Sequence, residues 1–328
     1  MPEGHTVHRI ARQFARHFVG HEVAASSPQG RFSEGATEID GQRMVSASAI
    51  GKQLFLGFDN DRILRVHLGL YGAWEFSGQI SVGAATGAAR GRRGQAGKAA
   101  TTEDVLQTAA DGEESLTSMG APRVARLRMA EQEKLTSLVD FPHEPVGAVR
   151  VRLLTDTAVA DLRGPTACVV LDPSQAAEAV AKLGPDPMND PPKKSENLFA
   201  ATVLKKPTPI GLLLMDQHVV SGIGNVYRAE LLFRARLNPR TPGREVPEAT
   251  VRALWKDWTR LLKSGVELCQ MVTVDRSGDE PYRTALVRRS ERNYVYHRTG
   301  LPCRVCGEHI LMEAFGGRKL YWCPFCQA

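Results

Sequence analysis

Four cysteines close to the C-terminus have the spacing of a zinc site. Cys303 and Cys306 form one C-x-x-C pair, and Cys323 and Cys326 form a second pair after sixteen intervening residues. Two such pairs can direct four thiolates at one Zn²⁺ in a tetrahedron, which leaves no position for water. We therefore predict one structural zinc ion, because so small a segment buries too little apolar surface to fold without metal. The alternatives are two disulfides or four core cysteines; disulfides are disfavoured because the N-terminal segment is charged and amphipathic, unlike a secretory signal.

The first residues of the chain could supply a nucleophile. Met1 is followed by the small residue Pro2, so we expect Met1 to be removed and a free prolyl amine to remain. A secondary amine is a strong nucleophile that can form an iminium with an aldehyde carbon. Glu3 lies next to it and could carry protons. The alternative is that Pro2 and Glu3 are merely an exposed terminus.

A glycine-rich turn in the second half has the features of a phosphate site. Ser221-Gly-Ile-Gly-Asn225 precedes a predicted helix over 225–236. The backbone N–H groups of such a turn are expected to face outward, the helix N-terminus adds positive dipole, and the Asn225 side chain is a further donor. Lys205 and Lys206, one helix upstream, could add charge. The alternative is a helix–turn–helix that is packed for structural reasons alone.

The composition favours a polyanionic partner. The chain has 328 residues with 42 Lys and Arg against 36 Asp and Glu, which gives a net charge of +6 and a pI of about 9.1. Such a balance is typical of proteins that bind nucleic acids, with an ordinary basic protein as the alternative. No apolar run of about eighteen residues is present, so no transmembrane helix is expected. Cys168 and Cys269 lie in apolar contexts as core residues, and a reducing cytoplasm fits the whole pattern.

The N-terminal half has the pattern of a β-sandwich with one long helix. Residues 6–19 carry apolar side chains at helical spacing with arginines on the other side, and Gly20 ends the helix. Short β-like segments follow, punctuated by Gly, Asn and Asp, which predicts packed sheets. They span residues 43–48, 53–58, 62–68, 73–76, 124–129, 150–155 and 167–171. Residues 78–121 interrupt them without aromatics or apolar periodicity, which predicts a disordered insertion, with a DNA-binding arm as the alternative.

The C-terminal half has helical character. The Pro-rich stretch 184–192 predicts a linker, after which Ser195 is placed to cap a helix that runs to Leu204. A short helical segment is expected over 209–216, and residues 248–263 form an amphipathic helix after Pro247. Together these patterns predict a multidomain α+β protein. Its expected parts are the sandwich with its long helix at 1–190, a helical domain at 191–285 and the four-cysteine zinc finger at 286–328.

An ordered set of motifs runs through the chain. They are Met1-Pro2-Glu3-Gly4, Gly51-Lys52, His67-Leu-Gly-Leu-Tyr-Gly72, Leu183-Gly-Pro-Asp-Pro187, Ser221-Gly-Ile-Gly-Asn225 and Tyr296-His-Arg-Thr-Gly-Leu-Pro-Cys303 before the finger. This set resembles the formamidopyrimidine-DNA glycosylase and endonuclease VIII family of base-excision repair enzymes, over nearly the whole chain except residues 78–121. The Pro-Glu-Gly start, the Leu70-Tyr71 pair and the Tyr321-Trp-Cys-Pro-Phe-Cys326 ending are more similar to the endonuclease VIII branch.

The resemblance implies a sandwich catalytic domain, a helix-two-turn-helix DNA-binding domain and a zinc finger, with damaged DNA as the partner. The chain is then expected to act as a monomer in the cytoplasm, at the nucleoid if the source is a bacterium. The implied catalytic residues are Pro2 as nucleophile on C1′, Glu3 as proton carrier, Lys52 at a phosphate and Arg318 in the finger. The implied DNA-binding residues are Leu70 and Tyr71, which fill the hole left by a flipped base, Lys182, and Asn225 with its glycine turn as phosphate clamp.

The chain departs from the family pattern at several positions. His5 and Thr6 stand where relatives often have Pro followed by Glu, and Gly69 replaces a polar residue that can help to fill the void. Asp161-Leu-Arg163-Gly-Pro differs from the corresponding loop of the purine-specific branch. These departures bear on lesion preference more than on reaction type.

The sequence therefore predicts a bifunctional DNA glycosylase and AP lyase that excises oxidised bases, preferably pyrimidines. It would act through a Schiff base at Pro2 and then cut the strand by β/δ-elimination. One rival is a non-catalytic damaged-DNA or junction-binding protein of the same fold, against which the intact Pro2, Glu3 and Lys52 argue. Another is a zinc-ribbon transcription or translation factor, in which the Pro-Glu start and the Leu70-Tyr71 pair have no role.

Overall fold

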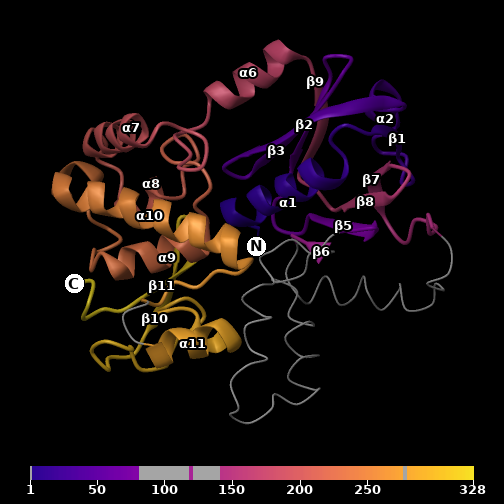
Figure 1. Ribbon diagram of the computed structural model, residues 1–328. Helices are drawn as coiled ribbons and strands as arrows, with labels where there is room; N and C mark the ends of the chain where they lie inside the picture. The colour runs from indigo at the N-terminus through magenta and orange to yellow at the C-terminus, as the bar shows by residue number, and fades with distance from the viewer. Residues whose placement is uncertain (1, 81–117, 121–140, 276–278) are drawn as a thin grey trace, which may run out of the picture. The chain divides into compact units, whose positions relative to one another are not determined.

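The computed structural model describes residues 2–80, 118–120, 141–275 and 279–328 (Figure 1). The predicted strand over 124–129 lies outside these residues. The chain forms two compact units. The first comprises Pro2, the described part of 6–180, and 267–270; the second comprises 3–5, 181–266 and the described part of 271–328. The boundaries at 190 and 285 stay a prediction.

The first unit is a β-sandwich. Its strands are β1 (Glu22–Ser26), β2 (Gln42–Ile50), β3 (Gln53–Phe58), β4 (Ile63–His67), β5 (Ala73–Gly78), β6 (Ser118–Met119), β7 (Val149–Leu154), β8 (Ala158–Arg163) and β9 (Ala167–Leu171). Neighbouring strands pair antiparallel in the order β6-β5-β8-β7-β1-β2-β3-β4-β9. In this order β4 and β9 lie at one end, and β5 and β8 lie near the other. The β4–β5 and β8–β9 connections therefore each run from one end of the strand order to the other.

The predicted N-terminal helix is present as α1 (Gly4–His17), which begins two residues before the predicted start. Its apolar face enters the sandwich core, where Ile10, Phe14 and Phe18 are fully buried. The Phe14 ring packs edge-to-face on Trp74 of β5, with 4.8 Å between the ring centroids. The helical spacing of apolar residues thus identified a helix whose burial stabilises the sandwich.

Several elements of this unit were not predicted. They are β1, β6, β8 and the helices α2 (Ser33–Ile39) and α6 (Pro173–Ala181). In β8, the charged residues Asp161 and Arg163 lie in a strand whose residues are all buried. Arg152 of β7 makes two hydrogen bonds of 2.7 Å to the Asp161 carboxylate, and this pairing allows the charges to be buried. The Asp161–Arg163 segment is therefore part of a strand and not of the loop that the comparison with the purine-specific branch implied.

The predicted insertion over 78–121 is too wide at both ends. Gly78 is the last residue of β5, and Ser118–Met119 form β6, in which Met119 pairs with Trp74. Met119 is buried in the sandwich core, so an isolated apolar residue anchors this short strand. Residues 81–117, which hold the rest of the predicted insertion, lie outside the described residues.

The second unit is helical and ends in a two-stranded hairpin. Its elements are α7 (Pro192–Leu204), α8 (Ile210–Leu213), α9 (Asn225–Arg234), the short 3₁₀ helix Gly243–Glu245, α10 (Glu248–Leu268), α11 (Asp279–Val287), the 3₁₀ helix Arg289–Glu291, β10 (Leu311–Phe315) and β11 (Arg318–Trp322). The predicted amphipathic helix is confirmed in α10, which runs five residues beyond its predicted end. Trp255 and Trp258 of α10 are buried, and the Trp258 ring packs against Tyr227 of α9 at 4.7 Å between centroids.

Two predictions about the start of this unit are corrected. Helix α7 begins at Pro192, so Ser195 lies inside its first turn and donates to the Pro191 carbonyl at 2.8 Å instead of capping the helix. The Pro-rich linker is in part a packed turn, because Asp186 is fully buried and the Ser221 hydroxyl donates to the Gly184 carbonyl at 2.7 Å. Because α7 begins at Pro192, its N-cap residue is Pro191, which has no side chain able to cap the helix.

Candidate functional site

Four cysteine thiols converge near the C-terminus of the second unit. The Sγ atoms of Cys303, Cys306, Cys323 and Cys326 all lie within 4.8 Å of one another. The Cys306–Cys323 sulfur atoms are 3.5 Å apart and those of Cys303–Cys326 are 4.0 Å apart. A tetrahedral zinc with Zn–S bonds of about 2.3 Å places its sulfur ligands at about these separations. The four residues therefore fit one zinc ion, which would cross-link the finger and leave no position for an activated water.

A tight hairpin turn presents Arg318. Strands β10 and β11 pair with Phe315 opposite Arg318, so Gly316 and Gly317 alone form the turn. Both glycines have positive φ, 61° and 70°, as a two-residue type I′ turn requires. Arg318 is exposed at the first position of β11. The turn thus fixes the backbone from which the guanidinium extends.

The carboxylate of Glu3 caps the N-terminus of α9. It is fully buried, and its oxygens accept hydrogen bonds from the backbone N–H groups of Gly224 at 2.9 Å, Val226 at 2.8 Å and Tyr227 at 3.3 Å. These donors and the helix dipole stabilise the ionised carboxylate. The amides of this turn therefore bind Glu3 and do not face outward, which corrects the expectation of an open phosphate pocket formed by them.

Two side chains from the first turn of α9 hold the hairpin turn. Asn225 Nδ2 donates to the Lys319 carbonyl at 2.8 Å. The Arg228 guanidinium donates to the carbonyls of Phe315 at 3.3 Å and Lys319 at 3.4 Å, and to Asn225 Oδ1 at 2.5 Å. The carbonyls on both sides of Arg318 are thus fixed from one helical turn.

Arg228 is a fully buried cation. Burial lowers the pKa of Arg228 to about 10; the negative charge of Glu3 opposes this change, and the positive charge of Arg318 adds to it. Its guanidinium carbon lies 6.0 Å from the centroid of the Phe315 ring, within cation–π range. Because a pKa of about 10 keeps Arg228 protonated at neutral pH, the hairpin carbonyls bind a full positive charge.

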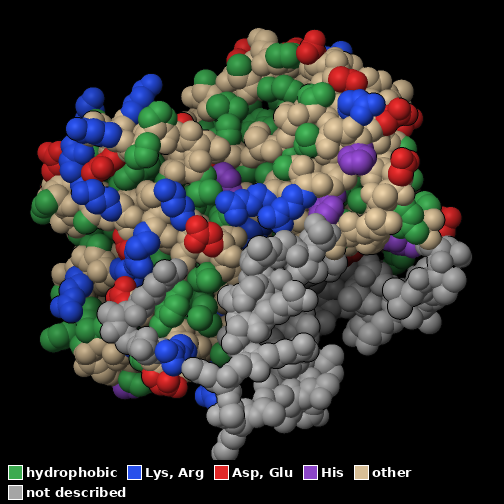
Figure 2. Space-filling view, viewed as in Figure 1, with side chains coloured by type: hydrophobic (Ala, Val, Ile, Leu, Met, Phe, Trp, Pro, Cys, Tyr) green, Lys and Arg blue, Asp and Glu red, His purple; other side chains and the backbone are tan. Residues whose placement is uncertain are grey.

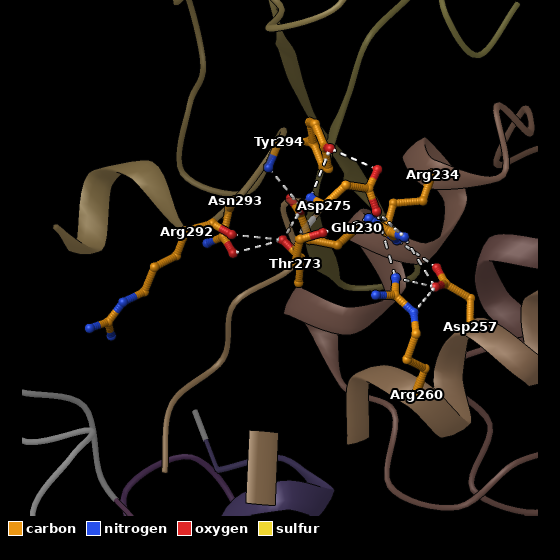
Figure 3. A network of polar contacts seen from close by, with 9 residues as sticks. All are labelled: Glu230, Arg234, Asp257, Arg260, Thr273, Asp275, Arg292, Asn293 and Tyr294. Carbon is orange, nitrogen blue, oxygen red and sulfur yellow. Dashed lines mark hydrogen bonds and ion pairs between the residues drawn. The ribbon is translucent and has the colours of Figure 1, made fainter. Parts of the chain in front are cut away.

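Further along α9, Glu230 organises the segment that leads into the zinc site (Figure 3). Its fully buried carboxylate accepts hydrogen bonds from the backbone N–H groups of Tyr294 at 2.8 Å, Val295 at 2.9 Å and Tyr296 at 2.8 Å. The Thr273 hydroxyl donates to the same carboxylate at 2.5 Å. One buried charge therefore fixes the backbone that precedes the first cysteine pair.

The last residue of α9, Arg234, joins the same network (Figure 3). Its Nε donates to Asp257 of α10 at 2.6 Å, and its Nη2 lies 2.8 Å from an Asp275 carboxylate oxygen. Its Nη1 donates to the Thr273 carbonyl at 2.6 Å. Arg234 thus fastens the loop after α10 to α9.

In the first unit, Lys52 lies at one end of the sandwich. Gln53 at the start of β3 pairs with His67 at the end of β4, and His67 pairs with Ala167 at the start of β9. Lys52 is half-buried in the turn just before Gln53. Burial lowers the pKa of His67, and the positive charges of Lys52 and Arg65 lower it further. Lys52 therefore lies close enough to His67 for its charge to act on the imidazole.

The β4–β5 loop carries Leu70 and Tyr71 at the same end. Leu70 is half-buried, whereas the Tyr71 side chain is 69% exposed. The loop is closed by a hydrogen bond of 2.9 Å from the Gly72 N–H to the Leu68 carbonyl. An exposed aromatic ring on a short, hydrogen-bonded loop is available to another molecule.

The remaining predicted residues are Pro2, which is buried, and Lys182, which is exposed directly after α6. The Lys182 carbonyl accepts a hydrogen bond from the His218 imidazole. In the same unit, Lys193 and Lys194 of α7 and Lys256 of α10 are also exposed. Figure 2 shows Lys and Arg side chains over these two helices. Among the predicted residues, the structure brings together Glu3, Asn225 and the Arg318 turn in the second unit, and places Lys52 and the loop with Leu70 and Tyr71 at the same end of the sandwich in the first.

Sequence reasoning missed Arg228 and Glu230. Both lie in Asn225-Val-Tyr-Arg-Ala-Glu-Leu-Leu-Phe-Arg234, a helix in which nine of the ten residues are buried. A charged residue on a buried helix needs a partner, and this requirement is a signal that points to tertiary bonds. The partners themselves lie on distant segments that the sequence does not indicate.

Three parts of the sequence match known domain families. They are the formamidopyrimidine-DNA glycosylase N-terminal domain at residues 1–134, the formamidopyrimidine-DNA glycosylase H2TH domain at 183–277, and the zinc finger found in FPG and IleRS at 300–328. Over 327 residues, covering 100% of both chains, the sequence is 38% identical to Endonuclease 8 1 of Mycobacterium tuberculosis and of Mycobacterium bovis. The chain belongs to the formamidopyrimidine-DNA glycosylase and endonuclease VIII family. It is also 34% identical to formamidopyrimidine-DNA glycosylase of Thermus thermophilus over 152 residues, which is 44% of this chain and 54% of that protein.

Solved structures share this fold. The fold matches the Lactococcus lactis Fpg complex with abasic-site DNA at a TM-score of 0.65, with 18% identity and 99% coverage of both chains. It matches MutM (FPG) from Thermus thermophilus at a TM-score of 0.64, with 20% identity and coverage of 99% and 98%. Family and fold confirm the predictions of a sandwich, a helical domain and a zinc finger, and of a DNA repair enzyme of the glycosylase and AP-lyase class. No helix in the described part of this glycosylase-family chain has the length and apolar character to cross a membrane.

Proposed function

We propose that this protein is a bifunctional DNA glycosylase and AP lyase that removes oxidised bases, preferably pyrimidines, through the amine of Pro2. The observation that carries the proposal is the bonding of Glu3, whose buried carboxylate fastens the N-terminal segment to three backbone amides at the start of α9. A nucleophile on a chain terminus needs such an anchor, because misplacement by about 1 Å can cost a hundredfold in rate.

The first chemical step forms a covalent adduct. Once Met1 is removed, the Pro2 nitrogen bonds to C1′ of the damaged nucleotide while the bond from C1′ to the base breaks. The base leaves as it takes up a proton. The C1′–O4′ bond then breaks, O4′ takes up a proton, and the Pro2 nitrogen, which has lost its own proton, forms an iminium with C1′. Glu3 holds a fixed carboxylate one residue from the amine, which can accept the proton that the amine loses and pass it on to O4′.

The second step cuts the strand. The iminium acidifies C2′, so loss of a C2′ proton expels the 3′ phosphate, and a further elimination expels the 5′ phosphate. Lys52 and Arg318 stabilise the negative charges of these phosphates, and Asn225 and Lys182 contact the strand near them. A planar guanidinium such as that of Arg318 suits two phosphate oxygens at once.

Excision also needs the damaged base to leave the stack. Leu70 and Tyr71 fill the space that it leaves, which lowers the cost of flipping. The exposure of Tyr71 supports this role, since the ring is available to stack on DNA bases. The preference for pyrimidines rests on the Leu70-Tyr71 pair and on the full-length relatives that bear the name Endonuclease 8 1.

The same proposal includes damaged DNA as the partner of a monomeric, cytoplasmic protein and one zinc ion in the finger. It also includes the division into a catalytic domain at 1–190, a DNA-binding domain at 191–285 and a finger at 286–328. Zinc supplies folding of the finger when bound, and the protein's own residues perform the chemistry.

Borohydride trapping on an abasic duplex tests this function. Borohydride reduces an iminium to a stable amine, so the wild type should form a covalent adduct that maps to Pro2. Pro2→Gly should keep DNA binding and lose most trapping, whereas Pro28→Gly, at an exposed proline after β1, should trap like the wild type. Adducts that map to Lys52 at full yield in Pro2→Gly would refute the role of Pro2. DNA binding without any trapping in the wild type would favour the non-catalytic rival.

A further inference from the structure

The side chain of His5 is buried against the helical unit, three residues after Pro2. It is 5% exposed. Its imidazole packs edge-to-face on the Tyr227 ring, with 5.6 Å between the ring centroids and 85° between the ring planes. Residues 3–5 belong to the second unit, as Tyr227 of α9 does. The His5 ring therefore fastens the start of the chain to α9 through a contact that Glu3 does not make.

The close packing of this ring depends on Gly265 near the end of α10. A Cβ built on Gly265 would lie 2.6 Å from the Tyr227 hydroxyl oxygen, and 3.1 Å and 3.3 Å from Cβ and Cγ of His5. Glycine inside a helix is less stable than alanine, because it loses more conformational freedom on folding. Gly265 lies within the 21 residues of α10, so its lack of a side chain needs another explanation. The space that it leaves open is the space that His5 and Tyr227 use.

Two bonds to the glycine turn before α9 hold the residues that precede His5. The Gly4 N–H donates to the Gly222 carbonyl at 2.9 Å, and the Glu3 carboxylate accepts from the Gly224 N–H at 2.9 Å. A long side chain such as that of Glu3 rotates about several bonds, so its carboxylate fixes a position more firmly than a direction. Three separate contacts are needed to fix the orientation of a rigid segment, and the His5 ring supplies the third.

We propose that His5 is a positioning residue for the reaction at Pro2. Packed between Tyr227 and Gly265, its ring sets the orientation of the first turn of α1, and with it the direction from which the Pro2 amine approaches C1′. This approach is sensitive to small displacements, because misplacement by about 1 Å can cost a hundredfold in rate. The ring performs this role without touching DNA. The inference rests on the proposed function, since it requires Pro2 to be the nucleophile.

The test measures DNA binding and covalent chemistry separately. Binding is measured on a duplex with a tetrahydrofuran abasic analogue, which cannot form an iminium, and chemistry as the single-turnover rate of borohydride trapping on an abasic duplex. In His5→Ala, we expect the trapping rate to fall about tenfold and the dissociation constant to stay within about twofold of wild type. His21→Ala, at an exposed histidine before β1, should match the wild type in both. Wild-type trapping in His5→Ala would overturn the inference.

His5→Phe separates ring packing from proton transfer. Phenylalanine keeps a planar ring and has no nitrogen that can carry a proton. The variant should recover most of the trapping rate, and its rate should depend on pH in the same way as that of the wild type. A His5→Phe variant that is as slow as His5→Ala, or that lacks one limb of the wild-type pH profile, would overturn the inference, because the reaction would then need the imidazole nitrogens.

Gly265→Ala tests the same contact from the opposite side. The new methyl group would overlap with Tyr227 and His5, so trapping should slow while DNA binding persists. Glu267→Ala places alanine at an exposed position of the same helix and should leave both measurements unchanged. Loss of DNA binding together with trapping in both His5→Ala and Gly265→Ala would also overturn the inference, because it would show that the contact only maintains the fold.

The wild type separates this inference from the function on which it rests. A wild type that forms no adduct on an abasic duplex would refute the proposed function and this inference together. A wild type that traps at Pro2, alongside a His5→Ala variant that traps equally fast, would refute this inference only.

Discussion

The loop end of the sandwich and the first turn of α9 are built in opposite ways. At the sandwich end, Tyr71, which we propose contacts DNA, is 69% exposed, and Lys52 and Leu70 are half-buried. At the start of α9, Glu3 and Arg228 are both fully buried and bonded to backbone groups. At the sandwich end, glycines shape the backbone of the loop that presents the side chains. At the start of α9, buried charges position one exposed arginine, Arg318.

We expect the exposed residues to serve DNA recognition and the buried charges to serve the stability of the fold. An exposed side chain can be removed with little effect on the folded state, since surface substitutions usually change stability by less than about 0.5 kcal/mol. A buried charge that loses its partner costs several times more. Variants at the sandwich end should therefore alter activity alone, and variants of the buried residues around α9 and of the zinc-site cysteines should alter activity and stability together.

The largest effect is expected for Cys303→Ser. Loss of one thiolate weakens a site whose metal contributes about 10 kcal/mol or more to folding of a finger. Zinc content should fall, residues 300–328 should become sensitive to protease, and cleavage of an abasic duplex should be lost. Cys168→Ser, at a half-buried cysteine of the sandwich, should keep its zinc. Full zinc content in Cys303→Ser would contradict the assignment of that ligand.

Glu3→Gln should lower the free energy of unfolding by about 2 kcal/mol or more, the scale of a hydrogen bond to a charged group. Glutamine is neutral, and its NH₂ group cannot accept from the amides of Gly224 and Tyr227. Urea unfolding measures the change. Glu34→Gln, at an exposed glutamate of α2, is the control and should change stability by less than about 0.5 kcal/mol. Equal stability of the two variants would show that the bonds to α9 contribute little.

Arg318→Ala tests whether this exposed arginine, which buried residues of α9 position, contributes to DNA binding without contributing to stability. It should retain zinc and wild-type stability, and weaken binding or strand cleavage by about 2 kcal/mol, as expected for a charged hydrogen bond. Arg62→Ala removes another exposed arginine, 44% exposed on the sandwich, and should have no such effect. Wild-type activity of Arg318→Ala on abasic and oxidised-pyrimidine duplexes would reject this role of the finger.

Tyr71→Ala should separate the two regions most clearly. Its ring is exposed, so unfolding should be unchanged within about 0.5 kcal/mol. Excision from duplex DNA should fall about tenfold, because stacking of a base on an aromatic ring contributes about 1–3 kcal/mol. The measurements are urea unfolding and single-turnover excision. A large loss of stability would show that the Tyr71 ring stabilises the fold as the buried residues at α9 do, and would contradict the distinction between the two regions.

The smallest effect is a pH dependence at Asp275. Burial alone would raise the pKa of Asp275, but the hydrogen bond and charge of Arg234 hold it below the ordinary 3.8. A carboxyl with a lowered pKa stabilises the fold above pH 3.8 and loses this contribution as the pH falls through its folded value. Asp275→Asn should therefore be less stable than wild type at neutral pH, and the difference should shrink in acid. A difference in urea midpoint that stays constant with pH would contradict the ion pair.

Much of this architecture could be predicted where one segment carries its own signal. The apolar faces of α1 and α10 and the spacing of Cys303, Cys306, Cys323 and Cys326 depend only on neighbouring residues. Strand β8 could not be predicted, because its Asp161 is buried only through Arg152 of another strand. The role of Glu230 likewise depends on Tyr294–Tyr296, more than sixty residues away.

The capping of α9 by Glu3 gives the protein a built-in reporter for hydrogen exchange. The first amides of a helix ordinarily exchange quickly, since no carbonyl within the helix accepts from them. Here the amides of Gly224, Val226 and Tyr227 bond to a buried carboxylate, so they should exchange slowly with deuterium. Any opening of the N-terminal segment would release these three amides together. Their deuterium uptake, read in one peptide by mass spectrometry, would therefore report how often the segment that bears Pro2, the proposed nucleophile, leaves its place.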